Sequence, residues 1–380
     1  MTGTELTQRT VAVWRRVQLP MSETFILNQV AALQRWRGQL VGVHAIDPSL
    51  TVPGVRLLDP NGTWNRLQRG GASRAGWTPG LRALLDGIGA DIVHAHFLTD
   101  ASTIWSSVAA ARRPLVVTAH GYDVTEAAPH MRREHPAAWR AFVRSVALFL
   151  PVSHFLAERL VGLGVPPSRI QVHYTGIPVP PDPMTSGRAG IAFVGRLVEK
   201  KGCADLLEAM SRLPQPLRST PITVVGDGPL RASLEQQAAD LGLHVRFRGA
   251  LPYSAVAAEL ARAQVFCVPS RTARGGDAEG FGMVFAEASA LRLPVVTYSS
   301  GGTPEAVADG RSGLLCPEGD VAALSAALQR VLADAELRSR LGAFGRERVE
   351  RSFDVVRQSV ALEDVYDRLA TTSRRSSARG

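Results

Sequence analysis

The chain has 380 residues, 45% of them hydrophobic and 20% charged, which fits a globular protein of two ordinary domains and excludes a disordered chain. No apolar run approaches the roughly 20 residues of a membrane helix, and the pair Arg15-Arg16 interrupts the first strand-like segment before a signal peptide could form, so we expect a cytoplasmic protein. The formal charge of +9 comes from scattered cations, which argues against a nucleic-acid partner and is compatible with peripheral contact with anionic lipid at the inner face of the cell membrane.

Apolar segments of strand length alternate with helical segments through the first half of the chain. After a first strand at 11–14, a polar loop leads into a helical pattern ending near Leu33, for which Ser22 is the expected N-cap. Residues 61–80, rich in Gly, Asn, Arg and Trp, are expected to form a mobile insertion. Further strands are predicted at 40–45, 91–96, 115–118 and 147–152. This alternation is typical of a parallel sheet covered by helices on both faces.

Three histidines stand at or near the carboxyl ends of these strands. His94 and His96 alternate with Ala95, so both should point to the same face of the sheet. A metal site would need a further ligand and none is apparent, so we expect His96 to line a ligand cleft. His120 follows the next strand, in the crevice where open parallel sheets bind ligands. The alternative is a structural histidine that caps its loop.

The segment 131–149 mixes four arginines with apolar and aromatic residues at helical spacing. Such a basic amphipathic helix either lies on a membrane surface or packs as an ordinary helix against its own sheet. We favour the second interpretation.

A linker and a second alternating unit follow. Four prolines in 177–187 forbid regular structure, so this segment should separate the domains. Strands are predicted at 190–195, 222–226, 245–249, 265–268, 294–297 and 313–316. The turn Gly226-Asp-Gly-Pro229 should lead into a helix with Pro229 at its first position. A polar helix is expected at 321–341, and the tail 371–380 is too polar to fold alone.

Two carboxylates dominate the second unit. On a helix starting near Gly282, Glu287 shares an apolar stripe with Met283 and Val284. A carboxylate buried there costs several kcal/mol unless it is hydrogen-bonded, so we expect a ligand, although a surface glutamate on an amphipathic helix is the plainer alternative. Glu279 precedes Gly280 and Gly282, where backbone amides can turn toward a ligand at the helix N-terminus.

A basic loop follows the first strand of this unit. Lys200 and Lys201 are the only lysines of the chain, so the general composition does not explain why both stand close to Arg196. A helix N-terminus, a guanidinium and an ammonium that converge make a diphosphate site; the alternative is a solvated turn. The chain has no Asp-x-Asp triplet, and its three cysteines have no metal spacing, so we expect a metal-independent site without a cofactor.

The ordered motifs resemble those of the retaining GT-B glycosyltransferases of family 4, the glycosyl transferases group 1. Two glutamates separated by seven residues are the family's signature. The other motifs are Thr118-Ala-His120-Gly121, Val194-Gly-Arg196-Leu-Val-Glu-Lys-Lys201-Gly202, Gly226-Asp-Gly-Pro229, Pro269-Ser270 and Gly301-Gly-Thr-Pro-Glu305. In place of a glycine-rich loop after the first strand the chain has Ser22-Glu23-Thr24-Phe25, as in the branch resembling colanic-acid and exopolysaccharide transferases.

The resemblance implies an α/β GT-B fold, in which two doubly wound Rossmann-like domains face each other across a cleft. It implies an N-terminal acceptor-side domain at 1–178, completed by a returning helix at 353–370, and a C-terminal nucleotide-sugar-binding domain at 187–352. The remaining tail at 371–380 would be disordered.

The resemblance assigns roles residue by residue. Arg196 and Lys201 would bind the diphosphate, Glu279 the hydroxyls of the transferred sugar, and Glu287 the nucleotide ribose. His120 would face the sugar at the reacting carbon. Backbone amides and the base contact would come from Phe281, Gly282, Met283, Gly249 and Leu251, and the acceptor side from Ser22, Glu23, His96 and Tyr122.

The predicted activity is transfer of a hexose from a nucleotide-diphosphate sugar to a hydroxyl of a glycan or lipid-linked glycan, with retention of anomeric configuration. Two alternatives remain at this point. A sugar-nucleotide epimerase of the same architecture would lack the Glu-x7-Glu pattern. A non-catalytic two-domain sugar-binding protein would close around its ligand, but it would not need the basic diphosphate site.

Overall fold

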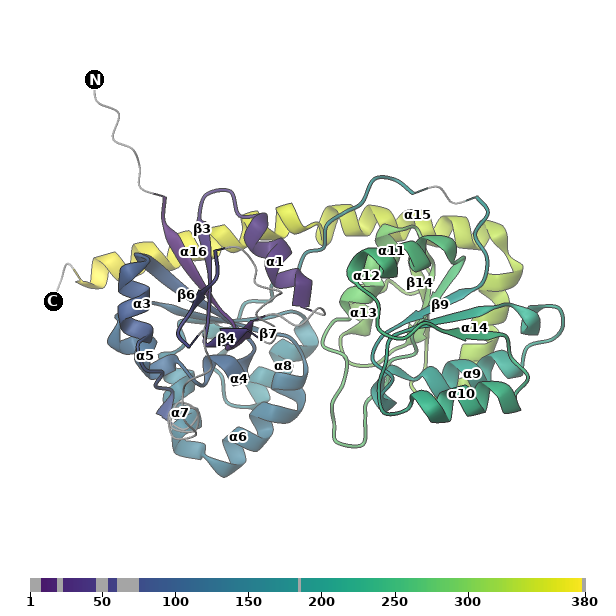
Figure 1. The fold of residues 1–380 in the computed structure, drawn as a ribbon, viewed down its shortest axis with the longest axis horizontal. Helices are drawn as coiled ribbons and strands as arrows, with labels where there is room; N and C mark the ends of the chain where they lie inside the picture. Colours follow the sequence, from purple (N-terminus) through teal and green to yellow (C-terminus); the bar gives the residue numbers. More distant parts are fainter. Residues whose placement is uncertain (1–7, 19–22, 46–53, 60–74, 184–185, 378–380) are drawn as a thin grey trace, which may run out of the picture. The chain divides into compact units, whose positions relative to one another are not determined.

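The computed structural model describes residues 8–18, 23–45, 54–59, 75–183 and 186–377. Two compact units are present, the first formed by Met1–Gly176 with Val355–Gly380 and the second by Ile177–Asp354. Each unit is built around its own parallel sheet with helices packed on it (Figure 1). This confirms the prediction of two doubly wound α/β domains.

Six parallel strands form the sheet of unit 1, in the order β5-β3-β1-β6-β7-β8. They are β1 (Thr10–Trp14), β3 (Arg37–Gly42), β5 (Arg56–Leu57), β6 (Ala90–His96), β7 (Leu115–Ala119) and β8 (Leu148–Pro151). The short strands β2 (Val17–Gln18) and β4 (His44–Ala45) pair separately. The chain runs from β1 outward to β5 and then returns to the other side of β1 with β6. The strand order therefore reverses between β1 and β6, where sheets of this type bind ligands.

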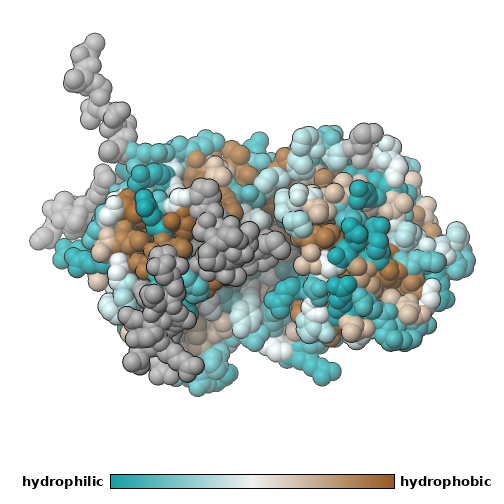
Figure 2. Space-filling view, viewed as in Figure 1, coloured by the Kyte–Doolittle hydropathy of each residue, from teal (hydrophilic) through white to brown (hydrophobic). Residues whose placement is uncertain are grey.

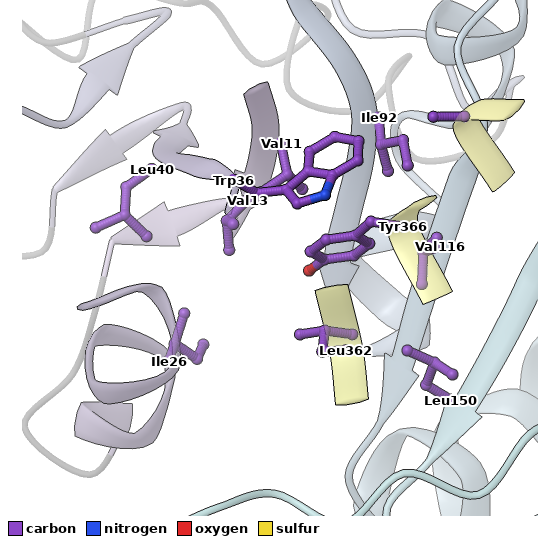
Figure 3. Packing of buried hydrophobic residues seen from close by; sticks show 11 residues of the cluster. Val11, Val13, Ile26, Trp36, Leu40, Ile92, Val116, Leu150, Leu362 and Tyr366 are labelled. Carbon is purple, nitrogen blue, oxygen red and sulfur yellow. The ribbon is translucent and has the colours of Figure 1, made fainter. Parts of the chain in front are cut away.

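The helices of unit 1 include the last element of the chain. Those described are α1 (Thr24–Ala31), α3 (Leu81–Gly87), α4 (Leu98–Ala101), α5 (Trp105–Ala110), α6 (Ala128–Glu134), α7 (Pro136–Ser145), α8 (His154–Gly162), α16 (Val355–Ser377) and the π-helical turn η3 (Asp123–Ala127). In the core shown in Figure 3, Leu362 and Tyr366 of α16 pack among strand side chains such as Val11 and Ile92. The ring centroids of Trp36 and Tyr366 lie 5.3 Å apart. Helix α16 thus completes the core of unit 1.

Unit 2 repeats the same strand order. Its parallel sheet runs β11-β10-β9-β12-β13-β14. The strands are β9 (Ile191–Val194), β10 (Ile222–Val225), β11 (Val245–Phe247), β12 (Val265–Cys267), β13 (Val295–Tyr298) and β14 (Gly313–Cys316). The helices are α9 (Cys203–Ser211), α10 (Arg231–Asp240), α11 (Tyr253–Arg262), α12 (Met283–Ala290), α13 (Thr303–Ala306), α14 (Val321–Ala333) and α15 (Ala335–Ser352). The order reverses between β9 and β12, so a ligand site is expected there.

Every strand predicted from the sequence lies on an observed strand, but three details of the helices were wrong. The single helix expected at 321–341 is two helices, because Asp334 ends α14 and its carboxylate accepts the N–H of Leu337 at 2.8 Å as the N-cap of α15. Helix α10 begins at Arg231, so Pro229 precedes the helix and does not occupy its first position. Helix α16 continues to Ser377, whereas residues 371–377 were expected to be disordered.

The basic segment 131–149 packs against its own unit. Trp139, Phe142 and Val143 of α7 are buried, and the arginines of this segment are exposed. On the face viewed in Figure 2, hydrophobic residues lie among hydrophilic ones, as on folded domains generally. None of the described helices has both the length and the apolar character needed to cross a membrane.

Two predictions fall on parts of the chain that are not described. Ser22 lies outside the described residues, and the described N-cap of α1 is Glu23, whose side chain makes no capping hydrogen bond. Most of the insertion expected at 61–80 also lies outside the described residues, which begin again at Ala75.

Candidate active site

The loops that follow β9 and β12 are joined by an ion pair at the point where the strand order of unit 2 reverses. Lys201 ends a 3-10 turn after β9, and Glu279 lies in the loop before α12. The ammonium of Lys201 donates to Oε2 of Glu279, and the hydroxyl of Ser270 donates to the same oxygen at 3.3 Å. The Lys201 and Glu279 side chains are only 15% and 13% exposed. The structure therefore brings together these two residues, which the sequence analysis assigned to the donor site.

Glu279 is held as an anion by its neighbours. Burial by itself would raise the pKa of this carboxyl, but the charges of Lys201 and Lys200 and the hydrogen bonds from Lys201 and Ser270 bring it below its ordinary value. Lys200 makes a second ion pair between the same two loops, with its ammonium 2.8 Å from Asp277. Both lysines of the chain thus tie the β9 loop to the β12 loop.

Close approach of backbones explains two of the glycine-rich turns. A Cβ on Gly302 would lie 2.0 Å from the carbonyl oxygen of Gly280, and the N–H of Gly302 donates to the carbonyl of Glu279 at 2.8 Å. A Cβ on Gly226 would lie 1.9 Å from the carbonyl oxygen of Gly195. Any side chain would therefore push the loops after β10 and β13 away from those that carry the lysines and Glu279.

Glu287 faces an almost wholly apolar cavity of about 150 Å³. It lies on α12, which begins after Gly282 as the sequence predicted. The cavity is lined by linker and helix residues: Ile177, Pro178, Pro180, Tyr253, Val256, Ala257, Leu260, Ala290 and Leu291. The side chain is half-buried, and the surrounding protein raises the pKa of its carboxyl to about 7. Since no described residue hydrogen-bonds this carboxylate, a ligand could supply the partner that burial calls for.

The other residues predicted for the donor side follow the same strands. Arg196 lies two residues after the end of β9 and is exposed, and its guanidinium makes no hydrogen bond or ion pair within the described ranges. Gly282 and Met283 form the N-terminus of α12, next to the buried ring of Phe281. Gly249 accepts the N–H of Gly226 at 2.8 Å. Leu251, two residues further on, is half-buried just before α11.

In unit 1 the three histidines lie together, because β6 and β7 are neighbouring strands. His94 and His96 stack with ring centroids 4.7 Å apart, and Nδ1 of His96 lies 3.0 Å from Nε2 of His120. His94 is held by the hydroxyls of Tyr366 and Thr118 at 2.6 and 2.7 Å. The cluster therefore extends from α16 to the loop after β7.

Asp123 positions the His120 turn, and the sequence analysis missed it. Its carboxylate, in a side chain only 1% exposed, accepts the backbone N–H groups of Leu98 at 2.9 Å, His120 at 3.0 Å and Gly121 at 2.8 Å. Burial raises the pKa of this carboxyl, although the three backbone donors oppose the shift. An acidic residue two positions after the glycine of a strand-end turn was the signal that could have found it.

The remaining acceptor-side residues are distributed differently. Glu23, only 8% exposed, forms a bidentate pair with Arg15, with N–O distances of 2.7 and 2.8 Å. Arg15 also pairs with the carboxylate of Asp100, and its guanidinium lies 4.6 Å from the centre of the Phe97 ring. Tyr122 is 54% exposed. The carboxylate of Glu23 is therefore engaged within the protein.

Neither the stacked histidines nor the cysteines of the described chain form a metal site. No three His, Cys, Asp or Glu residues there are placed to hold a metal ion. Cys203, Cys267 and Cys316 are buried free thiols, and burial raises the pKa of Cys203 to about 12. They are core residues of low reactivity.

Comparisons with known proteins cover nearly the whole chain. The Glycosyltransferase Family 4 model matches residues 22–179, and the Glycosyl transferases group 1 model matches residues 184–348. A GDP-mannose-dependent alpha-(1-6)-phosphatidylinositol monomannoside mannosyltransferase of Mycolicibacterium smegmatis is 31% identical over 275 residues, which are 65% of this chain and 71% of the relative. A putative colanic acid biosynthesis glycosyltransferase WcaL of Salmonella typhimurium is 35% identical over 221 residues, 55% of this chain and 53% of the relative.

A solved structure shows the same fold. The Anabaena protein Alr3699/HepE, in complex with UDP and glucose, aligns with a TM-score of 0.74 at 19% identity and covers 94% of this chain and 99% of its own.

Proposed function

The chain belongs to glycosyltransferase family 4 and transfers a sugar from a nucleotide sugar, and from this premise we propose that it moves a hexose onto a hydroxyl of a glycan or lipid-linked glycan with retention of anomeric configuration. The observation that carries the proposal is the Lys201–Glu279 pair at the strand-order reversal of unit 2, beside the N-terminus of α12.

The diphosphate binds through Arg196 and Lys201. An ammonium has three donors, and Lys201 gives one to Glu279, so further donors remain for phosphate oxygens. The guanidinium of Arg196 has no partner in the described chain. As the bond to the sugar breaks, negative charge grows on the leaving diphosphate, and these fixed cations with the helix N-terminus stabilise it. Glu279, ionised and close by, accepts hydrogen bonds from the sugar hydroxyls.

The nucleoside occupies the region of Glu287. Ribose hydroxyls donate to its carboxylate, which supplies the hydrogen bonds that the apolar cavity lacks. The backbone at Gly249 and Leu251 contacts the base. The half-exposed ring of Tyr253 stands at the same cavity, where it offers a flat apolar face to the nucleoside.

Retention proceeds by attack on the same face of the sugar. The acceptor oxygen forms its bond to the anomeric carbon as the bond to the diphosphate breaks, and the proton of the acceptor hydroxyl passes to an oxygen of the departing phosphate. No protein nucleophile is needed for this step, and no metal ion is needed to neutralise the leaving group.

The test begins with a panel of nucleotide sugars measured by thermal shift. GDP-mannose and UDP-glucose are natural first members, because the mycolicibacterial relative is named as GDP-mannose-dependent and the Anabaena protein was solved with UDP and glucose. A donor at one hundred times its Kd should stabilise the protein by about 2.7 kcal/mol.

Glycan and lipid-linked acceptors are then screened with that donor, with and without EDTA, and the anomeric configuration of the product is read by NMR. We expect a retained linkage and unchanged turnover in EDTA. An inverted product, or an epimerised sugar formed from the donor alone, would overturn the proposal.

A further inference from the structure

His96 is enclosed by two other imidazoles and has one contact that bears on chemistry. Its side chain is completely buried, and its ring stacks between those of His94 and His120, with centroid distances of 4.7 and 5.3 Å. Nδ1 of His96 lies 3.0 Å from Nε2 of His120, a hydrogen-bond distance. Nε2 of His96 is buried and has no hydrogen-bond partner.

The hydrogen bond between His96 and His120 can be made in two ways, with either ring as the donor, and the buried Nε2 of His96 distinguishes between them. A neutral imidazole carries one N–H and one bare nitrogen. If His96 donates from Nδ1, its buried Nε2 is a bare nitrogen. If His120 donates instead, His96 must carry its proton on Nε2, which buries an N–H without an acceptor. A buried N–H group without an acceptor is disfavoured in proteins, which favours His96 as the donor and His120 as the acceptor.

Both rings are neutral in the folded protein. Burial, followed by the nearby imidazole of His120 and the guanidinium of Arg15, holds the pKa of His96 well below its ordinary value. Burial, followed by the nearby imidazole of His94 and the guanidinium of Arg15, lowers the pKa of His120 to about 3. His173 is close enough to lower the pKa values of His94 and His96 further, and burial lowers its own pKa to about 4. A doubly protonated ring is therefore absent near neutral pH.

We propose that His96 is a positioning residue that fixes His120 in the tautomer with its proton on Nδ1, so that His120 offers the substrate a hydrogen-bond donor and not a base. Nδ1 of His120 makes no hydrogen bond to the described residues, and the ring is half-buried. Phe25 and Phe97 pack against this ring at centroid distances of 4.9 and 4.5 Å. Asp123 fixes the backbone.

The consequence for the reaction concerns the proton of the acceptor hydroxyl. A ring nitrogen that already carries a proton cannot accept another one without becoming an imidazolium, which the burial of His120 opposes. His120 instead donates a hydrogen bond to an oxygen of the substrate. This role toward substrate rests on the proposed function, whereas the tautomer is a property of unit 1 and does not.

The tautomer is tested without substrate. In the full-length protein labelled with 15N-histidine, ring nitrogens that carry a proton are distinguished from bare ones by their chemical shifts, and His120 is assigned by the signals lost in His120→Gln. We expect a protonated Nδ1 and a bare Nε2. His96→Phe keeps an aromatic ring in the stack and removes the donor, so His120 should then become a mixture of tautomers. A wild-type His120 with its proton on Nε2 would overturn the inference, whatever the enzyme's activity.

A kinetic test separates positioning from structure. His96→Phe should lower kcat roughly tenfold, the size of one lost hydrogen bond, with little change in the donor KM. His96→Asn places an amide donor near the position of Nδ1 and should recover most of the loss. Melting temperatures identify variants that fold, and only those are compared. A folded His96→Phe enzyme with the turnover and the His120 tautomer of the wild type would refute the positioning role.

Discussion

The two sheets of this protein have the same strand order, and each carries a cation paired with carboxylate at the point where that order reverses. In unit 1, Arg15 after β1 pairs with Glu23 and with Asp100, which follows β6. In unit 2, Lys201 after β9 pairs with Glu279, which follows β12. The equivalent positions have nevertheless acquired different properties.

The difference lies in how much hydrogen-bonding capacity remains. Burial alone would lower the pKa of Arg15, but the bidentate bond to Glu23 and the charge of Asp100 raise it well above its ordinary value. Its guanidinium also lies over the ring of Phe97. Lys201, by contrast, meets a single carboxylate and keeps donors to spare. The same place in a fold can therefore hold a structural lock or a ligand site, depending on which partners the chain itself provides.

The largest expected effect comes from removing Arg15, whose guanidinium pairs with two carboxylates. Arg15→Met leaves the carboxylates of Glu23 and Asp100 buried without their cation, with side chains only 10% and 9% exposed. Removing one partner of a buried pair costs about 3–5 kcal/mol, so the urea midpoint should fall sharply. Arg16→Met is the matched control, since this neighbouring side chain makes no ion pair within the described chain. Equal stability of the two variants would contradict a stabilising role for the ion pairs of Arg15.

The second expected effect is on catalysis rather than stability. Lys201→Ala should lower kcat/KM by a factor equivalent to about 2–4 kcal/mol of lost transition-state stabilisation, because it removes a cation that faces the developing charge of the leaving group. Lys200→Ala is the control: it removes the adjacent ammonium, which pairs with Asp277, and should change kcat/KM much less. Inorganic pyrophosphate should protect the wild type in a thermal shift and protect Lys201→Ala less. Wild-type kinetics in Lys201→Ala would remove the proposed role.

These two sites also show how far sequence reasoning reaches. Alternating apolar runs predicted both sheets. The resemblance to the family assigned Lys201 and Glu279 to one donor site, and they lie in contact because residues after the carboxyl ends of adjacent parallel strands meet at one edge. The partners of Arg15 were not predicted: Asp100 is 85 residues away, and no local pattern indicates such a pair. Asp334, which divides one expected helix into two, was missed because its neighbours continue the helical periodicity.

A third prediction concerns the backbone hydrogen bonds that Asp123 accepts around His120. Asp123→Asn keeps the volume of the side chain but turns an NH2 group toward some of the backbone N–H donors that Asp123 accepts. Leaving buried donors unpaired costs about 1–3 kcal/mol, and the displaced His120 turn should also lower kcat. Urea unfolding and steady-state kinetics measure the two effects. Asp86→Asn, at an exposed position of unit 1, is the control and should change neither quantity.

The last expected effect is a pH dependence that identifies Glu287, the carboxylate of unit 2 that no described residue hydrogen-bonds. The pKa of Glu287 is raised from 4.5 to about 7 by burial, so the folded protein binds this proton more tightly than the unfolded chain. Its contribution to stability is complete below pH 4.5, declines as pH rises and is lost as pH passes about 7. The slope is on the order of 1 kcal/mol per pH unit for a single proton.

Glu287→Gln should flatten that slope and should be more stable than the wild type above pH 7, whereas Glu336→Gln, at an exposed position, should leave the slope unchanged. Ribose hydroxyls that donate to the carboxylate favour its ionised form, so donor affinity in the wild type should rise through the same pH range and stay flat in Glu287→Gln. Calorimetric titration of the donor between pH 5 and about pH 8 measures this directly. If both proteins showed the same profile, the nucleoside would not be bound by Glu287, and unit 2 would owe its open hydrogen-bonding capacity to Arg196 and Lys201 alone.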